Sequence, residues 1–63
     1  MKTNIREFRE KLGLSQDEFA EKAGVARTVI SQLENGNRAV IRSDTMAKIA
    51  KALNKPIEDI FML

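Results

Sequence analysis

Apolar residues recur at helical spacing along short segments of the chain, and glycines, an asparagine or the single proline separate these segments. Ile5, Phe8 and Leu12 share one stripe of a first predicted helix with Arg9. Aromatic and β-branched residues never alternate with polar ones over a useful length, so the pattern predicts no sheet. The expected fold class is all-α, with five short helices.

The second predicted helix lies between Ser15 and Gly24 and has a well-marked beginning. Ser15 and Glu18 match the S-x-x-E capping box, in which a hydroxyl and a carboxylate each satisfy a free backbone N–H group. Phe19, Ala20 and Ala23 mark its apolar face. Gly24 suits the end of this helix and the start of a short turn.

A third helix is predicted over residues 27–35, with Ile30 and Leu33 on its buried face. The pair Asn35-Gly36 suits a left-handed C-terminal cap, so the helix should end there. Together with the second helix and the turn at Gly24, this helix predicts a helix-turn-helix unit.

Two further helices are predicted after a polar and basic loop. The fourth begins at Ser43 and ends at Asn54, and the fifth has Pro56 at its first helical position. The apolar face expected for the fifth helix consists of Ile57, Ile60 and Phe61. The chain therefore reads as one small all-α domain over residues 1–63.

Composition narrows the function classes further. The 63 residues include no cysteine and no histidine, which excludes disulfides, thiolate or imidazole metal ligands and nucleophile–imidazole pairs. We therefore expect no enzyme activity, no cofactor and no metal. The chain shows no apolar run near the length of a membrane span and no secretion signal, so the expected location is the cytoplasm.

An inward-facing Ile30 and Leu33 place a polar edge on the opposite side of the third helix, because residues four apart superpose on a helix. The residues of this edge are Arg27, Thr28, Ser31 and Gln32. Arginine can bond guanine through a bidentate fork, glutamine can do the same for adenine, and threonine or serine can touch a thymine methyl. The alternative is that these side chains form only a solvated helix face.

The distribution of charge favours nucleic acid as the partner of this edge. The net charge of +2 is too small to name a partner. However, residues 25–42 carry three arginines against one glutamate, whereas residues 15–24 carry three acids and one lysine. The polar edge thus lies in the basic part of the sequence.

The residues LSQDEFAEKAGVARTVISQLENG, at positions 14–36, strongly resemble the helix-turn-helix of the phage Cro and repressor family, also called the XRE family. The resemblance continues through MAKIAKALNKP and PIEDIF and so covers nearly the whole chain. It implies a compact lambda-repressor-like domain with a helix-turn-helix at about residues 15–35. It also implies a sequence-specific transcriptional regulator, most simply a dimeric repressor that reads a palindromic operator in double-stranded DNA through the major groove.

The resemblance implies roles for single residues. Those expected to contact bases are Arg27, Thr28 and Gln32, with Ser31 as a further candidate. Those expected to contact phosphates are Gln16, Asn35, Arg38 and Arg42. Arg9 and Glu34 match positions that form an ion pair between the first and third helices. Ala26 departs from the family, in which serine or threonine often caps the third helix.

The end of the chain bears on assembly. Its four successive apolar residues are Ile60, Phe61, Met62 and Leu63. One helical face cannot bury all of them within a monomer, so they are the predicted homodimer interface. The alternative is that they form an apolar cap on the core of the monomer.

Two other functions fit the same sequence. The chain could be an antitoxin or controller protein of the same fold, for which a second protein is the principal partner. It could also be a protein-interaction module that has lost DNA binding, although the polar edge and Gln16 argue against this reading.

Overall fold

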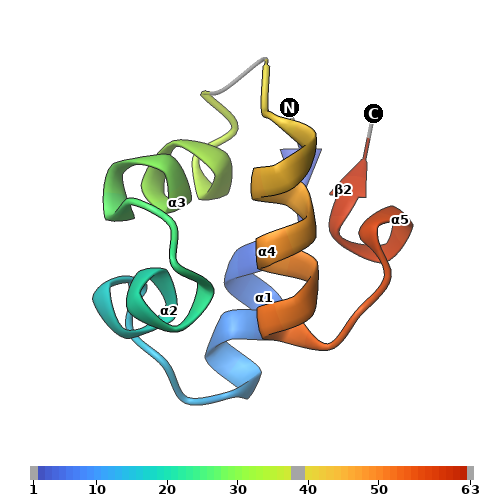
Figure 1. Cartoon of the computed structure of the whole chain (residues 1–63). Helices are drawn as coiled ribbons and strands as arrows, with labels where there is room; N and C mark the ends of the chain where they lie inside the picture. Colours follow the sequence, from blue (N-terminus) through green and yellow to red (C-terminus); the bar gives the residue numbers. More distant parts are fainter. Residues whose placement is uncertain (1, 38–39, 63) are drawn as a thin grey trace.

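The computed structural model describes residues 2–37 and 40–62, with Met62 described through its backbone alone (Figure 1). Within these residues the chain forms five α-helices and two very short strands. The elements in chain order are β1 (Lys2–Thr3), α1 (Ile5–Lys11), α2 (Gln16–Ala23), α3 (Arg27–Glu34), α4 (Ser43–Leu53), α5 (Ile57–Ile60) and β2 (Phe61–Met62). The predicted all-α class and helix-turn-helix are confirmed.

The predicted capping box sets the beginning of α2. The backbone N–H of Glu18 donates to Ser15 Oγ at 3.0 Å, and the backbone N–H of Ser15 donates to Glu18 Oε1 at 2.8 Å. The hydrogen bond from the Ser15 backbone is the main reason why the pKa of Glu18 lies below its ordinary value. The start of α2 is therefore set by contacts between residues that are neighbours in the sequence.

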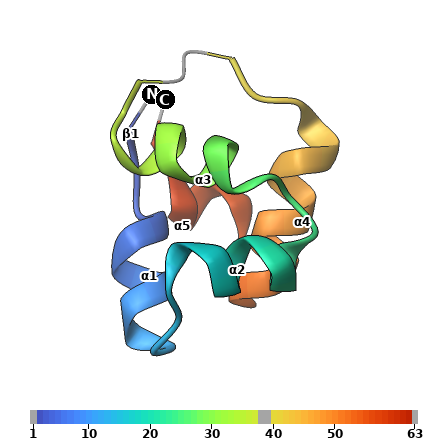
Figure 2. The same cartoon turned by 90° about the vertical axis from the view of Figure 1, so that its left-hand side faces the viewer.

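The turn between α2 and α3 depends on the left-handed conformation of Gly24, which has a φ of 71°. Its backbone N–H donates to the Ala20 carbonyl at 2.9 Å, and that of Val25 donates to the same carbonyl at 3.0 Å. A side chain would be strained at this φ. Figure 2, which looks onto this side of the molecule, shows α2 and α3 joined by the resulting short turn.

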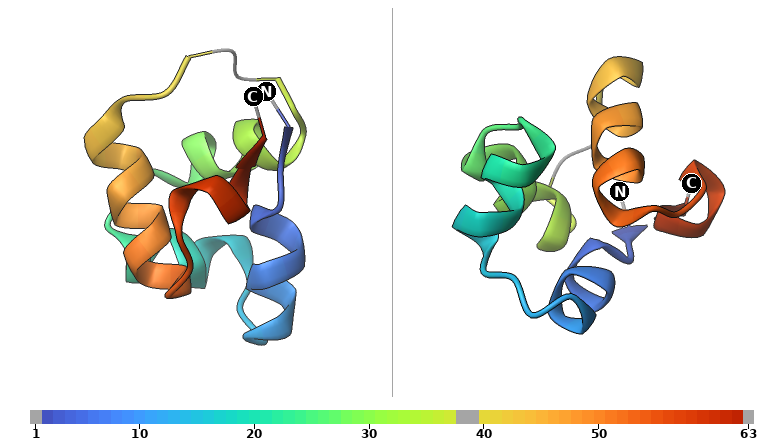
Figure 3. Two further views of the ribbon diagram at one scale, coloured as in Figure 1. Left: turned by 90° about the vertical axis from the view of Figure 1, so that its right-hand side faces the viewer. Right: turned by 60° about the horizontal axis from the view of Figure 1, so that its bottom comes forward.

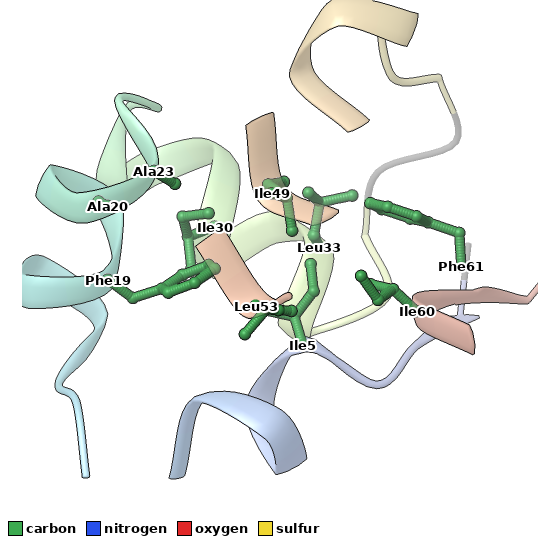
Figure 4. Packing of buried hydrophobic residues seen from close by; sticks show 10 residues of the cluster. All are labelled: Ile5, Phe19, Ala20, Ala23, Ile30, Leu33, Ile49, Leu53, Ile60 and Phe61. Carbon is green, nitrogen blue, oxygen red and sulfur yellow. The ribbon is translucent and has the colours of Figure 1, made fainter. Parts of the chain in front are cut away.

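The core lies where all five helices meet. In Figure 4 the buried side chains come from separate elements and point toward one another. The buried hydrophobic residues are Ile5, Phe19, Ala20, Ala23, Ile30, Leu33, Ile49, Leu53, Ile60 and Phe61. Since α3 contributes two of them, burial fixes how the helix is rotated about its axis and which side chains it exposes.

The prediction that the chain has no sheet is wrong in one detail. β1 and β2 pair antiparallel, with Lys2 opposite Met62 and Thr3 opposite Phe61. Figure 3 (left) shows the two strands side by side near the two ends of the chain. The Asn4 backbone N–H extends the pairing by donating to the Ile60 carbonyl at 2.8 Å. Strands of two residues have no room for an alternating pattern, so periodicity could not predict them.

The end of the chain also differs from the prediction. α5 stops at Ile60, and Phe61 continues into β2. Ile60 is fully buried and Phe61 is 5% exposed, whereas Ile57, expected on the apolar face, is 39% exposed. Assigning Ile60 and Phe61 to a dimer interface is therefore wrong, because both side chains fill this chain's own core. The side chain of Met62 and all of Leu63 lie outside the described residues.

The missing cap on α3 leads to a stability prediction. Ala26 occupies the N-cap in an extended conformation and makes no side-chain hydrogen bond there. Ala26→Ser should raise the free energy of unfolding by about 1 kcal/mol, because the hydroxyl can accept a free N–H of the first turn. The urea midpoint at constant m-value measures this change.

A matched control separates the effect of capping from the effect of introducing a serine side chain. Ala47 is exposed inside α4, so Ala47→Ser introduces the same side chain where no cap is possible. This variant should lose up to about 0.5 kcal/mol through lower helix propensity. Equal shifts in both variants would contradict the capping explanation.

Candidate nucleic-acid interface

The exposed edge of α3 carries the side chains predicted to contact bases. Arg27, Thr28 and Gln32 are exposed, and Ser31 is half-buried at the margin of the edge. The opposite face is anchored by Ile30 and Leu33, which are fully buried. We call Arg27, Thr28, Ser31 and Gln32 the reading edge. A rigid helix thus presents hydrogen-bonding side chains outward along one side.

Arg27, at the beginning of α3, forms an ion pair with an acid that the sequence did not single out. Its Nε lies 2.9 Å from Oδ1 of Asp17, in the first turn of α2. Both side chains are mostly exposed, at 62% for Arg27 and 77% for Asp17. Any acid in the first turn of a helix is a favourable charge there, so nothing in the sequence pairs Asp17 with Arg27. Its contact with Arg27 follows from the turn that brings α2 and α3 together.

Glu34, at the end of α3, is the centre of a buried polar network. Its side chain is fully buried and receives Arg9 Nε on Oε2 at 2.7 Å and Arg9 Nη2 on Oε1 at 3.0 Å. Arg9 is 11% exposed and also donates through Nη1 to the Leu14 carbonyl at 2.7 Å. The predicted ion pair between α1 and α3 is therefore present, and it is bidentate.

Protonation of the network follows from these contacts. Burial raises the pKa of Glu34, but hydrogen bonds from Arg9, Gln16 and Arg6 outweigh this effect, so the net pKa lies below the ordinary value. The hydrogen bond to Glu34 raises the pKa of Arg9. The pair stays ionised at neutral pH and ties the C-terminal end of α3 to α1.

Gln16, predicted to contact phosphate, is the first residue of α2 and is half-buried. Its Nε2 donates to Glu34 Oε1 at 3.1 Å. The network that fixes α3 therefore also fixes the side chain at the N-terminal end of α2. The sequence predicted separate roles for Gln16 and Glu34 and did not predict the contact between them.

Arg6 is a second residue that the sequence reasoning missed. Its Nε donates to Glu34 Oε1 at 3.3 Å, and its Nη2 donates to Asn35 Oδ1 at 3.3 Å. The second bond holds Asn35, which was predicted to contact phosphate. Arg6 is three residues before Arg9 and therefore shares a face of α1 with it, a spacing that could have revealed this partner.

The remaining predicted phosphate contacts lie toward α4. Arg42 is the N-cap residue of α4, its side chain is 82% exposed, and its Nε lies 3.4 Å from Asp44 Oδ1. Arg38 lies outside the described residues. The structure therefore places Arg42 at the end of the loop that follows α3, with an exposed guanidinium.

The residues that the structure describes contain neither a metal-binding cluster nor a membrane-spanning helix. No three His, Cys, Asp or Glu side chains within residues 2–37 and 40–62 are grouped so that they could hold a metal ion. In the same part of the chain, no helix has the length and apolar character needed to cross a membrane.

Comparison with known proteins agrees with this geometry. A helix-turn-helix family model matches residues 5–60. An uncharacterized HTH-type transcriptional regulator of Methanothermobacter thermautotrophicus is 49% identical over 65 residues, covering 100% of this chain and 91% of its own length. Control protein C.SmaI of Serratia marcescens is 41% identical over 54 residues, covering 86% of this chain and 63% of its own length.

Among solved structures, a chain of a SinR protein/SinI protein complex matches with a TM-score of 0.82 and 29% identity. The match covers 87% of this chain and 53% of that one. The family model and the alignment with the Methanothermobacter relative both include the α2–turn–α3 unit that carries the reading edge. The chain therefore belongs to the helix-turn-helix family of transcriptional regulators, of the XRE type.

Proposed function

We propose that this regulator binds double-stranded DNA sequence-specifically, with α3 in the major groove. The observation that carries the proposal is the reading edge, whose outward rotation is fixed by Ile30 and Leu33 in the core. Arg27 and Gln32 have side chains that can bond guanine and adenine in bidentate fashion, and Thr28 can touch a thymine methyl. Ser31, half-buried, is the weakest candidate for a base contact.

Residues on both sides of the reading edge would contact phosphates. We assign this role to Gln16, Asn35, Arg38 and Arg42. Gln16 lies at the N-terminal end of α2, where free N–H groups and the helix dipole attract phosphate. Glu34 and Arg6 hold Gln16 and Asn35 in place, so these contacts would begin from fixed side chains. Such contacts set the register of α3 on DNA and make the affinity depend on salt.

We further propose that the protein acts as a homodimeric repressor on a palindromic operator. A two-fold dimer would place two reading edges about one helical turn of DNA apart. Because Ile60 and Phe61 are buried within the chain, the interface would have to use other residues. Repression would then result from occlusion of the operator.

A second candidate is a controller protein whose DNA binding is linked to a protein partner. One relative is named a control protein, and the solved structure that matches is a complex of two different proteins. Purification of the tagged chain from its host tests this candidate. A stoichiometric second protein would favour it, and a homogeneous single species would favour the simple repressor.

The DNA-binding proposal predicts the outcome of a capture experiment. Purified protein is mixed with fragmented genomic DNA near physiological salt, in parallel with the variant Arg27→Ala, Gln32→Ala. The wild type should enrich a two-fold symmetric site, and the variant should lose or relax that enrichment. Each bidentate base contact contributes about 1–3 kcal/mol of discrimination. Both side chains are exposed, so melting should change little.

Lys48 and Lys51 provide a matched control, because both are exposed on α4 and lie outside the reading edge. The variant Lys48→Ala, Lys51→Ala should retain the enriched sequence. If the folded wild type enriches no sequence, the DNA-binding proposal fails and a protein-interaction module becomes the better explanation.

A further inference from the structure

Asp17 is an acid placed directly against the predicted DNA-reading surface. Its Oδ1 lies 2.9 Å from Arg27 Nε, and its side chain is 77% exposed. Exposed ion pairs contribute little to stability, about 0–1 kcal/mol. An acid next to a phosphate-binding helix end also opposes DNA binding through its charge. Neither the stability of the fold nor general affinity for DNA therefore explains well why an acid is found at position 17.

The atoms joined by this contact suggest a specific role. The guanidinium is a planar fork with several N–H donors, and Asp17 engages it through Nε. The Asp17 carboxylate lies at the Nε side of the group, and the N–H groups on the two terminal nitrogens include a pair that can face away from Asp17. Guanine O6 and N7 accept two N–H groups in one plane. Asp17 thus orients Arg27 while leaving a donor pair for a base.

We propose that Asp17 is a positioning residue that orders Arg27 for a single guanine and disfavours DNA sites that lack it. The inference rests on the proposed DNA-binding function and deepens it. On a site with guanine, Arg27 bridges the base and the Asp17 carboxylate. On a site without guanine, the carboxylate still approaches the DNA backbone but gains no base contact in return. Asp17 therefore raises the affinity for the specific site and lowers the affinity for other sites. Both effects increase the ratio of specific to non-specific affinity.

The substitution Asp17→Asn tests this role, because it removes the charge and keeps the size of the side chain. A random-sequence duplex library selected with the wild-type protein first identifies the preferred site. The same selection with Arg27→Ala identifies the G·C pair that this variant no longer prefers. Dissociation constants are then measured on the preferred site and on a duplex in which that G·C pair is replaced by A·T.

We expect Asp17→Asn to bind the preferred site about 3- to 10-fold more weakly, which is the effect of leaving one long side chain unordered. The same variant should bind the replaced site as well as the wild type does, or more tightly. In the double variant Asp17→Asn, Arg27→Ala, preference at this base pair should be no lower than in Arg27→Ala. Such non-additivity is the signature of a residue that acts through another.

Asp59→Asn is the control for charge. Asp59 lies in the first turn of α5 and is exposed, so the substitution changes net charge equally at a site remote from the reading edge. Asp59→Asn should not weaken binding to either duplex and should leave the ratio of the two dissociation constants unchanged. A general electrostatic effect would instead move both aspartate variants in the same direction on both duplexes.

The outcomes separate this inference from the function on which it rests. If the folded wild type selects no sequence, the DNA-binding proposal itself fails. If the wild type selects a site but Asp17→Asn keeps the full preference at the Arg27 base pair, the positioning role is overturned and the function stands. A uniform loss at every base pair, or no base pair sensitive to Arg27→Ala, also overturns the positioning role.

Discussion

Glu34→Ala is expected to lower the free energy of unfolding by about 3–5 kcal/mol, because it leaves a buried positive charge without its partner. Arg9 is 11% exposed and directs two N–H groups at the Glu34 carboxylate. A domain of this length has a total stability of about 3–9 kcal/mol. The variant should therefore be largely unfolded near 37 °C, as measured by urea and thermal melts followed by helical circular dichroism.

Two further variants identify the cause of this loss. Glu21 is an exposed residue of the same type on α2, so Glu21→Ala should change stability by no more than about 0.5 kcal/mol. The double variant Arg9→Met, Glu34→Leu should recover most of the loss, since an apolar pair can replace a buried ion pair at similar stability. An unchanged melting temperature with intact DNA affinity in Glu34→Ala would contradict the role given to the network.

The pH dependence of the same variant provides an independent measurement. The pKa of Glu34 is lower in the folded protein than its ordinary value. Its contribution is therefore present in full above the ordinary glutamate pKa and is lost as the pH falls through the folded value. The wild type should lose stability over this acid range, and Glu34→Ala should lose less. Arg9, whose pKa is raised, stays charged throughout.

Loss of Glu34 should also weaken DNA binding indirectly. The carboxylate joins α3 to Arg9 and Arg6 on α1 and to Gln16 on α2. Without these bonds the C-terminal end of α3 can tilt, and Gln16 loses the contact that holds it. We expect weaker binding to every sequence under conditions in which the variant is folded, with no change in base preference.

Local signals predicted most of the helix boundaries. The capping box starts α2 at Ser15, and the left-handed residues Gly24 and Asn54 end α2 and α4. Each signal depends on only a few neighbouring residues, so it can be recognised from the sequence without knowledge of the tertiary structure. Pro56 marks the start of α5, but no such signal marks its end: a four-residue helix is too short for a periodic face, and Phe61 is placed by its pairing with Thr3 at the other end of the chain.

The candidate site was predictable in position but not in its connections. Ile30 and Leu33 fix the rotation of α3, so the exposed edge followed from spacing. The contacts of Arg27 with Asp17, and of Glu34 with Gln16, join residues that only the folded arrangement of α2 and α3 brings together. Residue type suggests what each side chain can bond, and tertiary structure decides which partner it meets.

Phe19→Ala should be the most damaging core substitution, because Phe19 is fully buried among residues of the core. Truncation of a buried phenylalanine costs about 3–5 kcal/mol through lost burial and the cavity left behind. Phe8→Ala should cost less, since Phe8 is only half-buried. Urea denaturation of the two variants measures the difference.

Addition of DNA distinguishes the loss of stability in Phe19→Ala from a loss of base recognition. A ligand that binds only the folded state stabilises it by about 2.7 kcal/mol at a concentration of 100 times its Kd. Excess cognate duplex should therefore refold much of the Phe19→Ala protein, and its base preference should match the wild type. Arg27→Ala should show the reverse, with normal melting and altered preference. If the refolded Phe19→Ala protein chose different bases, the reading edge would depend on the core beyond its rotation, and Ile30 and Leu33 would not suffice to place it.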